Sequence, residues 1–276
     1  MPTDHTNDYP FGYNRNELER LGHQHRVWTE ENRRFLARAG FGEGATVVDL
    51  GCGPGYTTLD LARVVGPEGR VIAVDRDGAR SLPLLRERAD AAGFSNVETR
   101  AAELEDFDLP EASVDGVYGR WVLMYLPESA ATALVGRIAS WLRPGGVCAL
   151  AEFCNYRHIH IHPPSAHLPA IAEALMQAVA GDRGCNPEIG NVLSGLLRRA
   201  GLQVELHVVT KIVRALTPDW TWPDALFRVH LAGLVDEGYL TRELLHAFLA
   251  DWEELSRDPD AMFFGSPMME VVGRRC

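Results

Sequence analysis

Residues 46–55 read Thr-Val-Val-Asp-Leu-Gly-Cys-Gly-Pro-Gly, a short apolar run followed at once by three glycines at alternate positions. β-Branched apolar residues in such a run are typical of a strand that is buried on both faces. Residues 56–65 then carry a helical pattern. A glycine turn between a parallel strand and a helix lies at the carboxyl edge of the sheet, where the backbone can approach a ligand closely. The stretch therefore predicts a ligand site at this turn.

The same alternation of strand and helix continues to residue 153. Further strands are expected at 70–74, 97–101, 116–119 and 147–153, with helices at 79–92 and 130–142 between them. Two more strands are expected at 203–213 and at 268–273, and the last should run antiparallel to its neighbour and close the sheet. Alternation at this pitch predicts an α/β fold with a doubly wound, mostly parallel, seven-stranded sheet (Rossmann-like) and helical cap insertions.

Three segments are expected along the chain. Residues 1–40 contain a helical pattern over 15–39 and are interpreted as an N-terminal helical lid. Residues 41–153 form the ligand-binding core. Residues 154–276 complete the sheet and carry cap insertions at about 155–184 and 217–262.

Composition narrows the functions that this chain can have. The formal net charge is −11, which disfavours a nucleic-acid partner held through its phosphates. No run approaches the ~18 apolar residues of a membrane span, and the polar first 16 residues lack the apolar region of an export signal. The five cysteines show no CxxC pair, which favours a reduced, cytoplasmic location over a disulfide framework or a structural zinc site.

The glycine spacing G-x-G-x-G differs from the dinucleotide form G-x-G-x-x-G, because Tyr56 takes the last glycine position. No Gly-Lys-Ser/Thr follows, as it would in a phosphate-binding loop.

Acidic residues lie at the ends of successive predicted strands. Asp75 ends the second strand, where a carboxylate can accept both ribose hydroxyls of a nucleoside that lies over the glycine turn. Glu103 follows the third strand, where an adenine amino group would lie.

This constellation resembles the class I S-adenosylmethionine-dependent methyltransferases from about residue 40 to residue 153. The segment 113–118 resembles the fourth strand of that family, and 142–146 resembles the turn before its fifth strand. The resemblance implies S-adenosylmethionine as the cofactor and a set of residues that bind it. The methionine end is lined by Asp49, Gly51, Gly53 and Gly55, the ribose is held by Asp75, and the adenine lies beside Arg76 and the pair Glu103-Leu104.

The resemblance also implies a lid over the cofactor and a group that faces its carboxylate. Tyr13 and Gln24 lie on the N-terminal segment, which folds over the cofactor in many relatives that act on small molecules. Arg120 follows the fourth strand, where relatives place groups that face the methionine carboxylate or the substrate, and a cation is a favourable neighbour for a carboxylate.

The catalytic candidates lie at and beyond the fifth strand. Methyl transfer from a sulfonium is an in-line displacement, which depends on positioning and needs a general base only when the acceptor carries a proton. In the run His-Ile-His-Ile-His over 158–162, extended structure would place all three imidazoles on one face. We name His158 and His160 as candidate bases, with metal binding or a solvated face over inward-packed isoleucines as the alternatives. Glu152, at the end of the fifth strand, is a candidate for orienting an amine or hydroxyl.

Aromatic residues gather in the second cap insertion and just beyond it, and they fit either an apolar pocket or a cap core. They are Trp220, Trp222, Phe227, Phe263 and Phe264. The enclosed site that the cap predicts favours a small-molecule acceptor, methylated on oxygen or nitrogen in natural-product metabolism. A lyase or cyclase that uses the same sulfonium, or a non-catalytic binding protein, stays open because fold does not settle function. The sequence also leaves a homodimer open.

Overall fold

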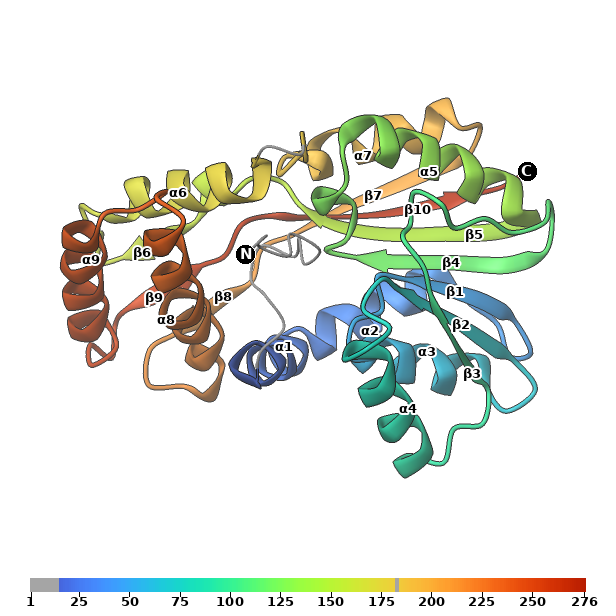
Figure 1. Cartoon of the computed structure of the whole chain (residues 1–276), viewed down its shortest axis with the longest axis horizontal. Coiled ribbons are helices and arrows are strands. Elements are labelled where there is room, and N and C mark those ends of the chain that lie inside the picture. The colour runs from blue at the N-terminus through green and yellow to red at the C-terminus, as the bar shows by residue number, and fades with distance from the viewer. Residues whose placement is uncertain (1–14, 182–183) are drawn as a thin grey trace, which may run out of the picture.

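The computed structural model describes residues 15–181 and 184–276, and its main body is a seven-stranded sheet (Figure 1). The strand order is β3-β2-β1-β4-β5-β10-β7, in which the first five are mutually parallel and β10 is antiparallel to both its neighbours. The strands are β1 (Thr46–Leu50), β2 (Arg70–Asp75), β3 (Val97–Ala101), β4 (Val114–Arg120), β5 (Leu142–Phe153), β7 (Gln203–Val209) and β10 (Met268–Arg274). The predicted doubly wound α/β fold is therefore confirmed.

Helices cover both faces of this sheet (Figure 1). One face carries α5 (Glu128–Trp141) and α7 (Ile189–Arg199), and the other carries α2 (Thr29–Ala39), α3 (Tyr56–Val65) and α4 (Ser81–Ala91). The central strands β1, β4 and β5 are almost entirely buried, because helices pack on both of their faces. Both strand ends that matter for the site, those of β1 and β2, therefore emerge from a rigid core.

Three boundaries differ from the sequence expectation. The predicted helix over 15–39 is interrupted at Trp28 and forms α1 (Arg15–Val27) and α2. The predicted strand over 203–213 is also two elements, because β7 stays in the main sheet while β8 (Ile212–Arg214) joins a second one. The expectation that the last strand closes the sheet was wrong, since β10 lies between β5 and β7 and β7 forms the edge.

The cap is built around that second sheet, of order β6-β9-β8, with β6 (His160–His162) and β9 (Met262–Phe264). Around it lie α6 (Leu168–Ala180), α8 (Thr221–Asp236) and α9 (Arg242–Leu255), and α1 packs against α8 (Figure 1). The remaining elements are the short 3-10 turns η1 (Leu123–Tyr125), η2 (Tyr156–His158) and η3 (Pro218–Trp220). The cap thus draws on segments from before, between and after the core strands.

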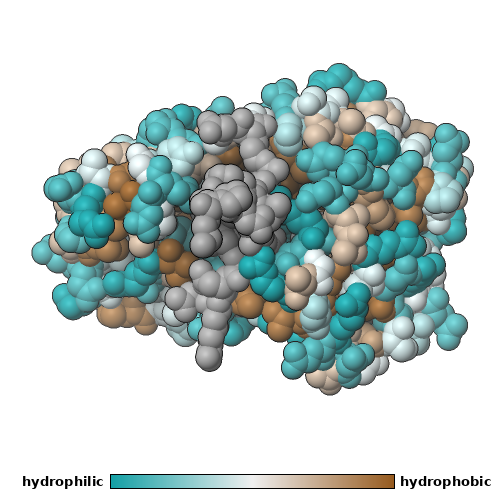
Figure 2. Space-filling model, in the orientation of Figure 1, coloured by the Kyte–Doolittle hydropathy of each residue, from teal (hydrophilic) through white to brown (hydrophobic). Residues whose placement is uncertain are grey.

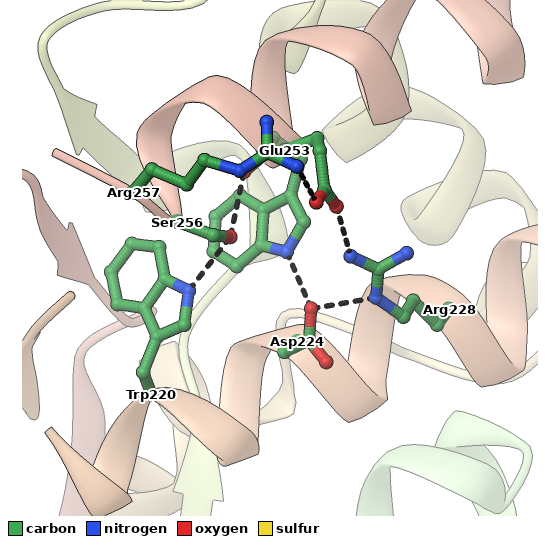
Figure 3. Close-up of polar contacts among 7 residues, drawn as sticks. Trp220, Asp224, Arg228, Glu253, Ser256 and Arg257 are labelled. Atoms are coloured by element: carbon green, nitrogen blue, oxygen red, sulfur yellow. Dashed lines mark hydrogen bonds and ion pairs between the residues drawn. The ribbon is translucent and has the colours of Figure 1, made fainter. Parts of the chain in front are cut away.

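Polar contacts hold α8 and α9 together (Figure 3). Asp224 accepts hydrogen bonds from the Trp252 indole at 2.9 Å and from Arg228 at 2.7 Å, and Arg228 also binds Glu253 at 2.8 Å. The Trp220 indole, stacked on Trp252 with centroids 4.5 Å apart, donates to Ser256. Since each indole N–H finds an acceptor, these large rings pack in the cap without an unpaired donor.

Hydrophilic residues predominate on the face drawn in Figure 2, and the brown areas between them are scattered. Within the described part of the chain, none of the helices has both the length and the apolar character needed to cross a membrane.

Candidate functional site

The glycine turn after β1 opens into the main cavity. Gly51, Gly53 and Gly55 have φ values of 60°, 51° and 86°, a region that favours glycine. A Cβ at Gly53 would meet no atom within 4 Å, so this residue leaves open space beside its backbone. A Cβ at Gly51 would come within 2.2 Å of Val122. Both glycines line the cavity, so the turn provides a cradle for a ligand that lies against its backbone.

Gly55 serves a different purpose from the one predicted. It does not line the cavity, and a Cβ there would lie 2.1 Å from Leu85 of α4. The expected contact between Gly55 and the cofactor is therefore corrected to a packing contact. The absence of a side chain allows the turn to approach α4 closely and lets α3 begin at the next residue.

Asp75, at the end of β2, is fixed in place by backbone amides. Its Oδ2 accepts from the Gly53 amide at 2.8 Å and its Oδ1 accepts from the Asp77 amide at 2.9 Å. Burial raises the pKa of Asp75, although these two amides oppose the shift. Asp75 lines the cavity, and each carboxylate oxygen can accept more than one hydrogen bond, so the anchored group retains capacity for two ribose hydroxyls.

Asp49 and the residues after β3 complete the part of the cavity formed by strand ends. Asp49 precedes the glycine turn, and its Oδ2 accepts a hydrogen bond from the Thr58 hydroxyl at 2.6 Å. Burial raises the pKa of Asp49 to about 7. Arg76, Glu103 and Leu104 all line the cavity, as the sequence predicted. Ala102, beside them, also lines it and was missed, because a small apolar residue gives no signal of its own.

The side chains of Arg120 and His25 both lie at the start of α3. Arg120 uses one nitrogen, Nη2, to donate to the Thr57 hydroxyl at 3.1 Å, while its Nη1 is buried without a partner among the described residues. Likewise His25 faces Asp60 with Nε2 at 3.7 Å, and its buried Nδ1 has no partner in the described chain. Both residues line the cavity.

The orphaned Arg120 donor fits the methionine end of S-adenosylmethionine. An unpaired buried donor is unfavourable unless a ligand satisfies it, and a carboxylate at the amino end of a helix would satisfy Arg120 Nη1. Burial lowers the pKa of His25 to about 4, with the Arg120 charge as a further cause. Arg120 would thus hold the carboxylate, and the uncharged His25, which the sequence did not single out, lines the cavity beside it.

The N-terminal helix α1 packs directly onto the turn. Gly22 lies so close to Tyr56 that a Cβ would be 2.5 Å from the phenol oxygen, and His25 stacks on the Tyr56 ring with centroids 5.3 Å apart. Gln24, a predicted lid residue, is buried, accepts from Arg20 and lines the cavity. Tyr13, the other predicted lid residue, lies outside the described residues.

Glu152 does not line the cavity, and it stabilises instead a segment of backbone beside the cavity. Its side chain is fully buried, and Oε1 accepts from the amides of Val122 and Leu123 at 2.8 and 2.7 Å. Burial raises its pKa to about 7. The prediction of Glu152 as a catalytic group is corrected to a positioning role, because it fixes the backbone just after Trp121, which itself has a φ of 56° and lines the cavity.

The histidine run lies outside the cavity. His158, His160 and His162 are exposed, whereas Ile159 and Ile161 are buried. Because β6 alternates its side chains, the isoleucines pack inward and the imidazoles face water. His158 and His160 are therefore wrong as candidate bases. Within 15–181 and 184–276, no group of three or more His, Cys, Asp or Glu side chains is placed to hold a metal ion.

The cap end of the cavity has aromatic walls. Trp121 stacks on Phe153 with centroids 5.3 Å apart, and Trp28 meets both of them and Trp222 edge-on. Trp222 and Phe263 line the cavity, together with Tyr156, Ile159 and Leu226. Trp220 and Phe227 instead pack in the cap core against Trp252. The aromatic cluster thus serves as both pocket wall and core, a division that spacing alone could not reveal.

A buried polar network interrupts these aromatic walls. His230 of α8 lies with Nε2 2.9 Å from Glu17 of α1, and Arg20 donates to both oxygens of Glu17 at 2.7 Å. Arg20 and His230 line the cavity. This network was not predicted, because Glu17 and Arg20 have the spacing of an ordinary surface ion pair on one helix and His230 lies far away in the chain.

Comparisons with known proteins agree with this geometry. Residues 47–146 match a family model described as a methyltransferase domain. A trans-aconitate 2-methyltransferase from Azoarcus sp. (strain BH72) is 38% identical over 128 residues, covering 46% of this chain and 47% of the relative. Phosphoethanolamine N-methyltransferase 1 from Triticum aestivum is 34% identical over 130 residues, covering 46% of this chain and 25% of the relative. The chain thus spans half or less of the length of these curated relatives.

Solved structures extend the similarity to most of the chain, at the level of the fold. A putative methyltransferase from Bacillus halodurans, 16% identical, covers 89% of this chain and 99% of its own, with a TM-score of 0.61. These findings confirm the resemblance that the motifs predicted.

Proposed function

We propose that this chain, whose residues 47–146 form a methyltransferase domain of the class I S-adenosylmethionine-dependent family, transfers the methyl group of S-adenosylmethionine to a small-molecule acceptor. One observation carries the proposal. The anchored Asp75 carboxylate and the unpaired Arg120 donor line the same cavity as the aromatic walls of the cap. A single continuous space thus has groups for the cofactor at one end and room for an acceptor at the other.

The chain's own residues bind and orient, and the cofactor supplies an electrophilic methyl group on its sulfonium. Asp75 would accept hydrogen bonds from the ribose hydroxyls, and Arg120 would bind the methionine carboxylate. Trp121 and Phe153 line the same cavity, and the faces of their aromatic rings would favour a neighbouring positive charge. The same walls exclude water and align the acceptor for in-line attack, which is where most of the rate gain would arise.

The named relatives support a small-molecule acceptor. They act on trans-aconitate and on phosphoethanolamine, by their names one oxygen-rich acid and one amine. Their similarity covers under half of this chain, so it supports the reaction class more than the acceptor. We include O- or N-methylation in the proposal, with natural-product metabolism as the setting, because the cap encloses the acceptor end within its own helices.

The location and partners belong to the same proposal. A net charge of −11 supports an acceptor other than nucleic acid, and the free state of all five cysteines supports the reducing cytoplasm. A homodimer is compatible with this function, since the described cavity is lined within one chain.

Product analysis tests the reaction. The purified protein is incubated with S-adenosylmethionine and a pool of hydroxyl- and amine-bearing metabolites, and the products are separated by mass spectrometry. Methyl transfer gives S-adenosylhomocysteine in step with a product heavier by one CH₂. Methylthioadenosine in its place would indicate a lyase or cyclase. Cofactor binding without turnover on any acceptor would favour a binding protein.

A further inference from the structure

The two edges of the main sheet differ in how they are protected from pairing with a further strand. At one edge, β3 carries Glu98 and Arg100, which form an ion pair at 2.7 Å, and Glu98 also binds Arg70 of β2. Charged side chains of this kind discourage another strand from adding to a sheet. At the other edge, β7 reads Gln-Val-Glu-Leu-His-Val-Val and contains no lysine, proline or glycine. The β7 edge therefore lacks the usual protection.

Exposed apolar side chains gather along this second edge. Leu206 and Val208 of β7 are 41% and 58% exposed. Ile212 is also exposed and lies on β8, the edge strand of the second sheet, and Leu216 follows β8. Val192 lies on α7, which packs against β7. Among the described residues no other large apolar side chain is exposed, and a concentration of this kind marks an interaction surface.

One face of β7 is apolar along its length. Gly273 of β10 lies opposite Val204, and a Cβ on Gly273 would be 2.7 Å from Leu197 of α7. Opposed residues of two paired strands point to the same face of a sheet, so Val204 also points to the α7 face. Because side chains alternate along a strand, Leu206 and Val208 share this face.

The other face of β7 carries an acid and a histidine. His207 Nε2 lies 2.7 Å from Glu205 Oε1, and both side chains are at least 40% exposed. When a strand pairs antiparallel with its own copy about a two-fold axis, residues equally far from the central residue lie opposite one another. With Leu206 at the centre, Glu205 lies opposite His207 of the second copy. Val204 likewise lies opposite Val208.

We propose that two copies of this chain form a dimer by antiparallel pairing of β7 with β7, with Leu206 at the two-fold axis. Opposite charges and apolar pairs across two strands both stabilise a sheet. A centre at Glu205 would instead set two carboxylates opposite each other, and a centre at His207 would set Glu205 opposite Val209. The strand is therefore complementary to itself in one register, which favours a second copy over an unrelated strand. The dimer is independent of the proposed function, because none of the β7 residues lines the cavity.

Sedimentation equilibrium of the purified full-length chain tests for the dimer and its interface. The wild-type protein should sediment at twice its monomer mass of 30.5 kDa at micromolar concentration. Leu206→Lys sets two ammonium groups opposite each other at the axis and should give a monomer. Glu98→Lys introduces a lysine at the β3 edge and should leave the dimer unchanged.

An exchange of charges tests the register. His207→Glu would set Glu205 opposite a second carboxylate at both symmetric positions, and it should raise the Kd of the dimer by about tenfold or more. Combining it with Glu205→Lys reverses the two charges of each pair and should restore the dimer. Circular dichroism and binding of S-adenosylhomocysteine report that each variant is folded.

Several results would overturn the dimer proposed here. They are a wild-type monomer, a dimer that persists in Leu206→Lys, and a double variant that stays as weak as His207→Glu. A monomer that holds an unrelated protein at β7 would also overturn it and would identify a heteromeric interface. All of these results leave cofactor binding, and with it the proposed function, untouched.

Discussion

The cofactor half of the cavity is made mainly from the ends of β1, β2, β3 and β4, whereas the cap half is made from α1, α8 and the second sheet. In the first half, most functional groups lie at the end of a strand, as Asp75 ends β2. In the second half, His230 and Glu17 are 213 residues apart in the chain, and their contact joins α8 to α1. A site on a strand end can be read from local sequence, and a site between distant helices requires the tertiary fold.

The largest expected effect falls on the cofactor half alone. Asp75→Ala should weaken S-adenosylmethionine binding by about 2–4 kcal/mol, because it removes a charged acceptor for two ribose hydroxyls. Calorimetry with the purified variant measures the change. Asp115→Ala provides a matched control: Asp115 also accepts from a backbone amide, that of Thr46 at 2.8 Å, but it lies at the opposite end of the sheet. Unchanged affinity in folded Asp75→Ala would remove the main support for the cofactor site.

A smaller effect is expected at Glu152, which lies between the cofactor half and the cap half of the cavity. The pKa of Glu152 is raised to about 7 by burial, so the folded state holds this proton more tightly than the unfolded state does. The stabilisation is fully present below the ordinary glutamate pKa and is lost as pH rises through about 7. Glu152→Gln should therefore gain about 1–3 kcal/mol relative to wild type between pH 5 and pH 8.

Urea unfolding at several pH values measures this difference. Glutamine keeps an oxygen that can accept from the Val122 and Leu123 amides, so the turn should keep its conformation. A difference in unfolding free energy that stays constant with pH would show that Glu152 is not a strongly perturbed group. Packing of Trp121 against Phe153 would then stabilise this turn of the backbone instead.

The smallest effect is expected on the outer face of the cap. Single exchange of His158, His160 or His162 for Asn should change turnover and stability by less than about 0.5 kcal/mol, as is usual for exposed positions. The pH dependence of the rate and its response to a chelator should also match wild type. A large loss of turnover in one variant would show that this histidine takes part in the reaction and that β6 moves toward the cavity.

The residues at the strand ends show how much of the site can be predicted from the sequence. The residues Gly51, Asp75 and Glu103 were predicted from the order of strands, because the carboxyl ends of parallel strands meet at one edge, whereas Arg120 was predicted from the resemblance to the methyltransferase family. His158 and His160 were misjudged for a related reason. The run follows β5 at that same edge, but the chain first turns through η2, which directs the isoleucines inward. Alternation predicts that three side chains share a face and does not say which face is buried.

His25 and the His230 network could not have been predicted in this way. His25 gains its role from Arg120 and Tyr56, which lie on other elements. Glu17 and Arg20 are three residues apart on α1, the common spacing of a solvated ion pair, and the packing of α8 against α1 brings His230 onto Glu17. Tertiary contact, which no local pattern records, turned an ordinary pair into part of the cavity wall.

A crystal structure of the complex with S-adenosylhomocysteine tests the central claim most directly. We expect one nucleoside per chain over the glycine turn, with its ribose hydroxyls on Asp75 and its carboxylate within hydrogen-bond distance of Arg120. The sulfur should then face the chamber of Trp121, Phe153 and Trp222. A ligand bound elsewhere, or one whose ribose leaves Asp75 without a contact, would contradict the assignment of the two halves.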